Sequence, residues 1–218
     1  MPAPPEPDYV PPGPDSLHIV YIDEALIVAD KPLGLLSVPG RGSLKHPSVR
    51  TYLSDNYGSV FDIHRLDLDT SGLIVMARTK AAQSELARQF ASRDVIKVYD
   101  ALVSGTMDGN SGEIDLPIGR DWDDRPRRCI DMRSGKPSKT LWKLETQSAT
   151  HAHVRLQPLT GRTHQLRLHM ASIGHPILGD RLYGEESSAG RLCLHASSLM
   201  FKHAESDEIL QFQSTAAF

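Results

Sequence analysis

The residues best suited to chemistry lie in one short segment, HRLDLDTSG at positions 64–72. It places acidic, basic and hydroxyl side chains in a turn that leads directly into an apolar run, GLIVMA at 72–77. Loops held by a rigid strand often carry catalytic groups. A carboxylate such as that of Asp67 can attack an anomeric carbon or stabilise positive charge there, as in retaining glycosidases. The composition alone still favours a plain surface turn in which Asp, Ser and Thr side chains cap the backbone.

Four further segments occur in a fixed order around this turn, and together they resemble one enzyme family. HRLDLDTSG matches in full the HRLDxxTSG signature of the RluA family of pseudouridine synthases. The others resemble that family's amino-terminal strand pair with its Lys-Pro turn, its tyrosine segment, its third motif and its last core strand: DEALIVADKPLGLLSVPG, KVYDALVSG, LQPLTGRTHQLRLHMASIGHPILGDRLYG and LCLHASSLMF. The resemblance covers residues 18–213. SVPGR at 37–41, DWDDRP at 121–126 and GKP at 135–137 favour the branch that lacks an RNA-binding S4 domain.

This resemblance implies an activity and a fold. The activity is the isomerisation of specific uridines to pseudouridine in structured RNA, in ribosomal large-subunit RNA, a transfer RNA anticodon stem-loop or both, without a cofactor. The fold is of the α+β class, a mixed and mainly antiparallel sheet with flanking helices and a central RNA-binding cleft. The family's nucleophile falls on Asp67, its tyrosine on Tyr99 and the arginine of its Gln-Leu-Arg run on Arg167.

These three residues suit the reaction, which breaks the N1–C1′ bond of uridine, turns the uracil and rejoins it through C5. Asp67 could attack C1′, add to C6 of the base or remove a proton at C2′, and the sequence does not choose among these steps. A carboxylate in a dry pocket needs a partner. Arg167 can supply one, because it lies at the edge of the apolar stripe of its expected helix. Tyr99 offers a ring for stacking on uracil and a hydroxyl near C5.

Further residues of these motifs are candidates for substrate binding. Arg65, two residues before Asp67, could fill the space that a flipped base leaves in the RNA stack. His64 is better suited to organising the turn than to acid-base work. Thr70 completes the signature, and Arg162 precedes the Gln-Leu-Arg run. We expect all four to line the uridine site.

A basic stretch at residues 125–143 is a second candidate RNA contact. It carries an excess of six positive charges, although the whole chain has a formal net charge of −3, which alone speaks mildly against a nucleic-acid binder. Arg127, Arg128 and Lys136 are the residues that we expect to contact phosphates. A solvated loop and hairpin explains this stretch about as well when it is considered by itself.

Two other functions stay open. Asp67 with a water molecule would make an RNA N-glycosidase, and the basic stretch alone would make a non-catalytic RNA-binding or chaperone module. RNA binding by itself requires no Asp between Arg65 and Thr70, which speaks against the module. The histidines do not indicate a metal, because His164 and His169 are five residues apart and no Cys or carboxylate cluster completes a ligand set. We expect neither a metal nor a cofactor.

The elements that must position these residues follow from periodicity and turn signals. Residues 1–16 hold seven of the 15 prolines and are expected to form a disordered tail, and residues 17–218 one catalytic domain. Helices are expected at 47–57, 80–92 and 163–173, the last with Leu166, Met170 and Ile173 inward. Strands are expected at 18–22, 25–29, 72–77, 95–103, 112–117, 127–133, 138–146, 151–158, 192–200 and 208–213. Many strands with few helices predict an α+β domain around a largely antiparallel sheet.

The remaining features are those of a globular protein. Hydrophobic residues make up 39% of the chain and charged residues 23%. No apolar run approaches the roughly 20 residues that a bilayer requires, and the amino terminus lacks the basic and apolar regions of a secretory signal. Cys129 and Cys193 lie far apart, without metal or redox spacing. We expect a cytoplasmic protein with no membrane contact, and a monomer.

Overall fold

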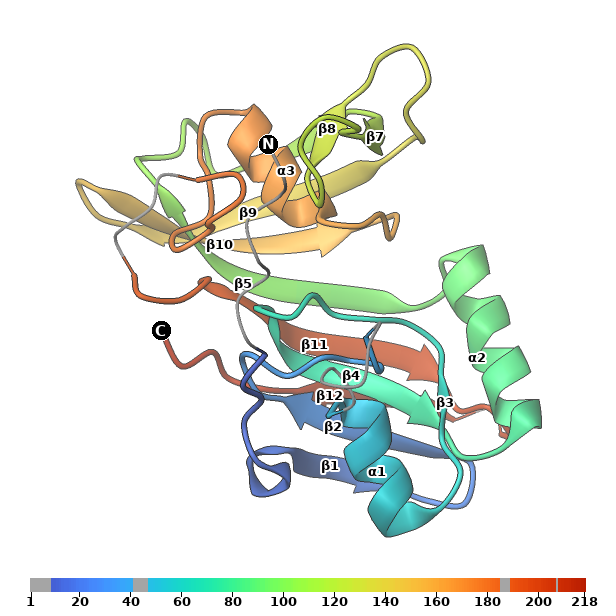
Figure 1. Ribbon diagram of the computed structural model, residues 1–218. Coiled ribbons are helices and arrows are strands. Elements are labelled where there is room, and N and C mark those ends of the chain that lie inside the picture. The colour runs from blue at the N-terminus through green and yellow to red at the C-terminus, as the bar shows by residue number, and fades with distance from the viewer. Residues whose placement is uncertain (1–8, 41–46, 185–188, 207) are drawn as a thin grey trace.

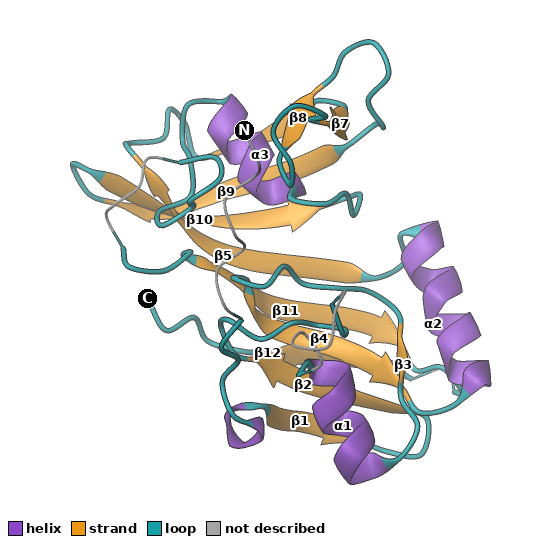
Figure 2. Ribbon diagram, viewed as in Figure 1, coloured by secondary structure: helices purple, strands orange, loops and turns teal. Residues whose placement is uncertain are grey.

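The computed structural model describes residues 9–40, 47–184, 189–206 and 208–218. Within them, ten strands form one large sheet and two form a small sheet beside it (Figures 1 and 2). The strands are β1 (His18–Ile22), β2 (Leu26–Lys31), β3 (Phe61–Asp62), β4 (Ser71–Ala77), β5 (Ile96–Ser104), β6 (Ser111–Asp115), β7 (Ile118–Arg120), β8 (Arg128–Ile130), β9 (Lys139–Gln147), β10 (His151–Pro158), β11 (Leu194–Lys202) and β12 (Ile209–Gln213).

The large sheet is mixed but almost wholly antiparallel. Its order is β1-β2-β4-β11-β5-β10-β9-β6, with β3 paired to β4 and β12 paired to β11. Among the described strands, β4 and β11 form the one parallel pair. The small sheet consists of the antiparallel pair β7–β8. This architecture confirms the predicted α+β class and mainly antiparallel sheet.

Two helices cover opposite faces of the same strands. They are α1 (Val49–Tyr57) and α2 (Lys80–Ser92). The hydrophobic cluster that contains Val49 and Leu53 of α1, the α1 cluster, includes Ile27, Ala29, Ile74 and Met76 of the sheet. The cluster that contains Leu86 of α2, the α2 cluster, includes their neighbours Leu26, Val28, Leu73 and Val75. Successive residues of a strand point to opposite faces. The apolar run at 72–77 is therefore buried on both sides, as its composition predicted.

The third helix, α3 (Gln165–Ser172), covers the other half of the face that carries α1. Its cluster takes in Ala101 and Val103 of β5, and Tyr99 packs against both this cluster and the α1 cluster. Because Tyr99, Ala101 and Val103 alternate along β5, they point to one face of the sheet. Figure 1 shows α1 over the β1–β2 half and α3 over the β9–β10 half, with β4, β11 and β5 between them. Tyr99 thus lies between two hydrophobic clusters.

Most predicted elements are confirmed, three of them with the expected bounds: β1, α2 and β10. The expectation at 127–133 was too long, because β8 stops at Ile130 and Asp131 Oδ1 accepts the backbone N–H groups of Arg133 and Ser134 in a turn. The inward placement of Ile173 was wrong. That side chain is 37% exposed, since α3 ends at Ser172. The short strands β3 and β7 were not predicted.

The predicted tail falls partly outside the described residues, because its first eight residues are not among them. Residues 9–16, the described part of the predicted tail, lie against the domain. The Tyr9 hydroxyl donates to Pro47 O at 2.9 Å and accepts from Leu36 N at 3.0 Å, and the Tyr52 hydroxyl donates to Pro12 O. Tyrosine hydroxyls therefore fix a proline-rich segment whose own composition predicts no structure. Within the described chain, no helix combines the length and apolarity that a bilayer crossing requires.

Candidate active site

A cleft of about 840 Å³ opens on the face of the sheet that α1 and α3 cover. It brings together the loop between β3 and β4, the start of β5 and the segment that leads into α3. Its lining includes seven of the predicted site residues: His64, Arg65, Asp67, Thr70, Tyr99, Arg162 and Arg167. Residues far apart in sequence thus meet at one place.

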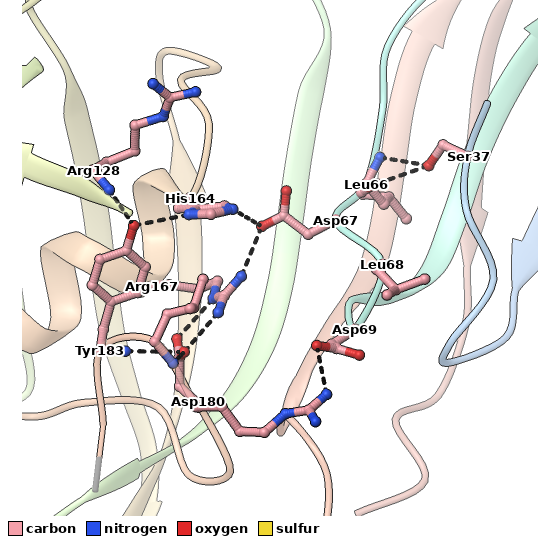
Figure 3. A network of polar contacts seen from close by, with 12 residues as sticks. Ser37, Leu66, Asp67, Leu68, Asp69, Arg128, His164, Arg167, Asp180 and Tyr183 are labelled. Carbon is pink, nitrogen blue, oxygen red and sulfur yellow. Dashed lines mark hydrogen bonds and ion pairs between the residues drawn. The ribbon is translucent and has the colours of Figure 1, made fainter. Parts of the chain in front are cut away.

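The backbone on both sides of Asp67 is tied to the end of β2 and to the segment that follows it. Figure 3 shows the bonds between Ser37 and Leu66. Ser37 Oγ donates to Leu66 O at 2.8 Å and accepts from Leu66 N at 3.0 Å. On the other side, Leu68 O accepts from Lys31 Nζ at 3.0 Å and from Gly34 N at 3.1 Å. The carboxylate itself, with 30% of its side chain exposed, projects into the cleft. The loop therefore holds Asp67 through its two neighbours, so that its carboxylate is not used to fix the loop.

Lys31 is fully buried beneath this loop. Its Nζ donates to three backbone carbonyls, those of Pro32, Leu35 and Leu68. Burial lowers the pKa of Lys31 to about 7, although the carboxylates of Asp69, Asp67 and Asp30 oppose that shift. Three acceptors use all three donors of an ammonium group. Lys31 is thus a fully satisfied clamp under the Asp67 loop, and its donors are not available to a ligand.

Arg167 pairs closely with one carboxylate and more loosely with a second. Its Nε and Nη2 bind the fully buried Asp180 in a bidentate manner at 2.7 and 2.6 Å, while Nη1 lies 3.4 Å from Asp67 Oδ2. Burial opposes the charge of both partners, yet their pairing outweighs it: the pKa of Arg167 is held above its ordinary value and that of Asp180 below it. Asp180 therefore fixes the guanidinium, and Arg167 offers one edge to Asp67.

His164 lies on the other side of the Asp67 carboxylate, with its Nε2 3.9 Å from Oδ2. Its backbone is left-handed, with φ at +56°, immediately before α3. Burial lowers the pKa of His164, so the neutral ring with a single N–H is favoured. The Tyr183 hydroxyl accepts from Arg128 N and can give its hydrogen to His164 Nδ1, each at 2.8 Å. This assignment directs the ring's N–H, at Nε2, toward Asp67.

Tyr99 lines the cleft from β5. Burial, together with the nearby Asp67 carboxylate, raises the pKa of Tyr99 well above its ordinary value. The phenol therefore stays protonated and presents both an aromatic ring and a neutral O–H to whatever occupies the cleft.

His64 supports the loop. Its Nε2 accepts from Val75 N at 3.1 Å, and its ring stacks on Phe90 with the centroids 4.6 Å apart. Burial and the nearby Lys97 lower the pKa of His64 to about 3, so the ring is neutral and acts as an acceptor. This agrees with the expectation that it organises the turn. Thr70 also closes the loop, because its N–H donates to Asp67 O at 3.1 Å.

The predicted arginines and lysine fall into two groups. Arg65 and Arg162 are exposed and line the cleft. The second group belongs to the β7–β8 unit, which we define as residues 118–136: the two short strands, the loop between them and the turn after β8. Its members Arg127, Arg128 and Lys136 do not line the cleft. Arg127 pairs with Asp124 at 3.0 Å, and the buried Nε of Arg128 has no hydrogen-bond partner among the described residues. The two groups therefore form separate candidate contacts for RNA.

Sequence reasoning missed several residues that shape the site: Lys31, Ser37, His164, Asp180 and Tyr183. All five lie in segments that resemble the family's motifs, so the signal was present without the contacts that explain it. In the sequence, the spacing of His164 speaks only to metal binding, which it does not favour. Among the described residues, no three His, Cys, Asp or Glu side chains are placed to hold a metal ion. That no metal is required stays a prediction.

Comparisons with known proteins agree with this geometry. Residues 25–172 match the sequence model of the RNA pseudouridylate synthase family. The chain is 44% identical over 214 residues to the dual-specificity RNA pseudouridine synthase RluA of Pasteurella multocida. The aligned residues cover 96% of this chain and 98% of that protein. It is 43% identical over 215 residues to the corresponding Escherichia coli protein, with 97% and 98% covered.

Solved structures show the same fold. Human RNA pseudouridylate synthase domain containing 1 superimposes with a TM-score of 0.80 and 31% identity, over 96% of this chain and 87% of that one. Human RNA pseudouridylate synthase domain containing 4 superimposes with a TM-score of 0.72 and 25% identity, over 93% of this chain and 90% of that one. The complete HRLDLDTSG signature, the cleft built around it and these similarities agree. The chain belongs to the RluA family of RNA pseudouridine synthases.

Proposed function

We propose that this protein converts specific uridines of structured RNA to pseudouridine, with Asp67 as the nucleophile. The observation that carries the proposal is the placement of Asp67. Its carboxylate projects into an 840 Å³ cleft, between Arg167 at 3.4 Å and His164 at 3.9 Å, on a loop fixed at both neighbouring residues. A positioned carboxylate with room for a nucleoside is the arrangement that chemistry at a ribosyl carbon needs.

The reaction conserves every atom of the RNA. The N1–C1′ bond breaks, the uracil turns within the cleft, C5 bonds to C1′, and the proton at C5 leaves while N1 gains one. Asp67 has three possible first steps: attack on C1′, addition to C6 of the base, and proton removal at C2′. Each of them uses one carboxylate oxygen and leaves the other for Arg167. Arg167 orients the carboxylate in all three, because Asp180 holds its guanidinium in a fixed plane.

Tyr99 supports the second half of the reaction. Its protonated hydroxyl and flat ring line the same cleft as Asp67. We assign the ring to stacking on the uracil and the neutral phenol O–H to a hydrogen bond beside C5, the carbon whose proton leaves. Arg65, exposed beside Asp67, fills the space that the flipped uridine vacates in the RNA stack.

The substrate is RNA with a compact stem-loop. The relatives above carry the name dual-specificity RNA pseudouridine synthase, and we extend that breadth to this chain as activity on both ribosomal large-subunit RNA and a transfer RNA stem-loop. Arg162 on the cleft rim and the β7–β8 unit supply positive charge beside the cleft. Such contacts position a stem without reading its bases. We further propose a monomer that works in the cytoplasm, in line with its two free cysteines.

One experiment separates this function from an RNA N-glycosidase that would use the same carboxylate and water. Stem-loop RNA is incubated with the protein in EDTA, in a buffer where the RNA fold has been verified, and analysed by nucleoside mass spectrometry. Isomerisation conserves mass and yields pseudouridine, whereas a glycosidase releases free uracil and leaves an abasic site. Free uracil, or activity that only added zinc restores, would contradict the proposal. An Asp67→Asn variant that replaces the parent protein in cells would favour a non-catalytic RNA-binding or chaperone module.

A further inference from the structure

The loop between β7 and β8 presents a tryptophan to solvent. Trp122 is 64% exposed, and the guanidinium groups of Arg120 and Arg125 lie over its ring, 5.4 and 5.0 Å from the ring centre, so a base that stacks there would take the place of a guanidinium. Tryptophan is enriched at contact surfaces, because its ring offers a large apolar face and its N–H a polar edge. The flanking cations favour contact with an anionic partner.

Polar contacts hold this loop in one shape. Asp121 Oδ1 accepts the backbone N–H groups of Asp123 and Asp124, both at 3.1 Å, so the chain turns tightly around Trp122. The carboxylate of Asp124 pairs with Arg127 at 3.0 Å. The ring is therefore presented in advance, and a partner that stacks on it would not have to order the loop first.

The unit that carries Trp122 is joined to the wall of the cleft at two points. Arg128 N, in β8, donates to the Tyr183 hydroxyl, which bonds to His164 beside Asp67 (Figure 3). The segment that follows β8 is joined as well, since Pro137 O accepts from Arg162 Nε at 3.4 Å. An RNA stem-loop seated with its uridine at Asp67 would thus have the β7–β8 unit beside it.

We propose that Trp122 is a stacking platform for an unpaired base of the substrate RNA, a base other than the reacting uridine, with Arg120 and Arg125 beside the adjoining phosphates. This inference rests on the proposed function, because it takes the RNA in the cleft as its occupant. Every base has a flat face, so a tryptophan ring accepts bases with little regard to sequence. A platform outside the cleft would let one enzyme hold RNAs that differ around the target uridine.

The test compares RNA affinity between the parent protein and two variants at this position. Trp122→Ala should raise the Kd for a stem-loop substrate about 5- to 150-fold, the range that loss of a base–aromatic stack gives. Trp122→Phe, which keeps a ring, should recover most of the affinity. Met132→Ala is the matched control, because Met132 is 73% exposed in the turn after β8 but carries no ring. It should bind like the parent.

Two further readouts separate stacking from an electrostatic or structural role. The slope of log affinity against log salt should stay the same in Trp122→Ala, because no phosphate contact is lost. Single-turnover rates at saturating enzyme should stay within about threefold of the parent, less than about 0.7 kcal/mol of barrier. Thermal unfolding should not change, since the side chain is exposed.

The stacked base is found by removing bases one at a time from the RNA. One abasic RNA should bind the parent weakly, and its affinity should fall no further with Trp122→Ala. Losses that do not add in this way identify two groups that share one contact. The proposal is overturned if Trp122→Ala binds as tightly as the parent, or if every abasic loss adds in full to the loss from Trp122→Ala. It is also overturned if this variant changes only self-association. In each case the parent still forms pseudouridine, whereas a failure of the proposed function would appear as no pseudouridine at all.

Discussion

Arg167 reaches Asp67 through a single contact, between Nη1 and Oδ2 at 3.4 Å. The remaining edge of the guanidinium is bound by Asp180, whose side chain is fully buried. The buried pair supplies the fixed geometry, and the long contact leaves Asp67 free to shift toward a substrate carbon. A carboxylate bound as tightly as Asp180 would be a poor nucleophile, because its oxygens would already be occupied.

Loss of the buried pair should be costly. Arg167→Met leaves the Asp180 carboxylate buried without its partner, and we expect the free energy of unfolding to fall by about 3–5 kcal/mol. The control is Arg50→Met, since the Arg50–Asp62 pair at 3.1 Å is 45% and 43% exposed and should contribute less than about 1 kcal/mol. Urea denaturation followed by circular dichroism measures both. Equal losses in the two variants would contradict the account.

His164 should act as a positioning residue for Asp67. His164→Asn tolerates the left-handed backbone at this position, but its shorter side chain cannot reach Asp67. We expect kcat to fall about tenfold, which is about 1.4 kcal/mol of barrier, with KM within about twofold. His151→Asn makes the same change at the start of β10, where the ring contacts Ser148, and should be neutral. An unchanged kcat, or a rise in KM alone, would rule out this role.

His64 should make the protein sensitive to acid. Its folded pKa of about 3 lies below the ordinary value of 6.5, so between about pH 3 and pH 6.5 the unfolded chain binds up to one more proton than the folded chain. Stability is therefore lost as the pH falls from about 6.5 toward about 3, by at most about 1.4 kcal/mol per pH unit. His64→Gln can still accept from Val75 N–H but does not titrate. Its stability should depend less on pH in this window, and identical pH profiles would count against the assignment.

The basic unit beside the cleft should act through phosphates. In a variant with Arg127, Arg128 and Lys136 all changed to Gln, the slope of log affinity against log salt should become shallower by about 0.7–0.9 for each lost phosphate contact. Single-turnover rates at saturating enzyme should stay within about threefold. The control removes equal charge at three residues that do not line the cleft, Arg88, Lys143 and Arg155. Equal slopes for the two triple variants would place the RNA footprint elsewhere.

The sequence predicted the elements well where the signal is local, and it placed the candidate residues on them. The turn before β4 carries Asp67 because a short polar segment precedes an apolar run, and α2 ends where its periodicity ends. The helical pattern placed Arg167 at the edge of the apolar stripe, beside Leu166, and the structure places it in the lining of the cleft. Such features depend on neighbours within about ten residues, and a single sequence contains them.

What the sequence could not reveal depends on contacts between distant segments. Asp180 is the main partner of Arg167, but no spacing rule joins a helix to the turn after it. A lysine before a proline usually indicates a solvated turn, yet Lys31 is fully buried because three carbonyls, one of them 37 residues away, surround its Nζ. The strand β7 is three residues long, too short for a period of two to be recognised.

The central claim is that Asp67 performs the chemistry, and single-turnover pseudouridine formation at saturating enzyme tests it most directly. Asp67→Asn should form no detectable pseudouridine while its affinity for the RNA stays within about threefold of the parent. The matched control is Asp69→Asn, two residues along the same loop, where the carboxylate contacts Arg181 at 3.4 Å and should not be required. Turnover by Asp67→Asn at a tenth of the parent rate or more, or loss of activity in Asp69→Asn instead, would contradict the account.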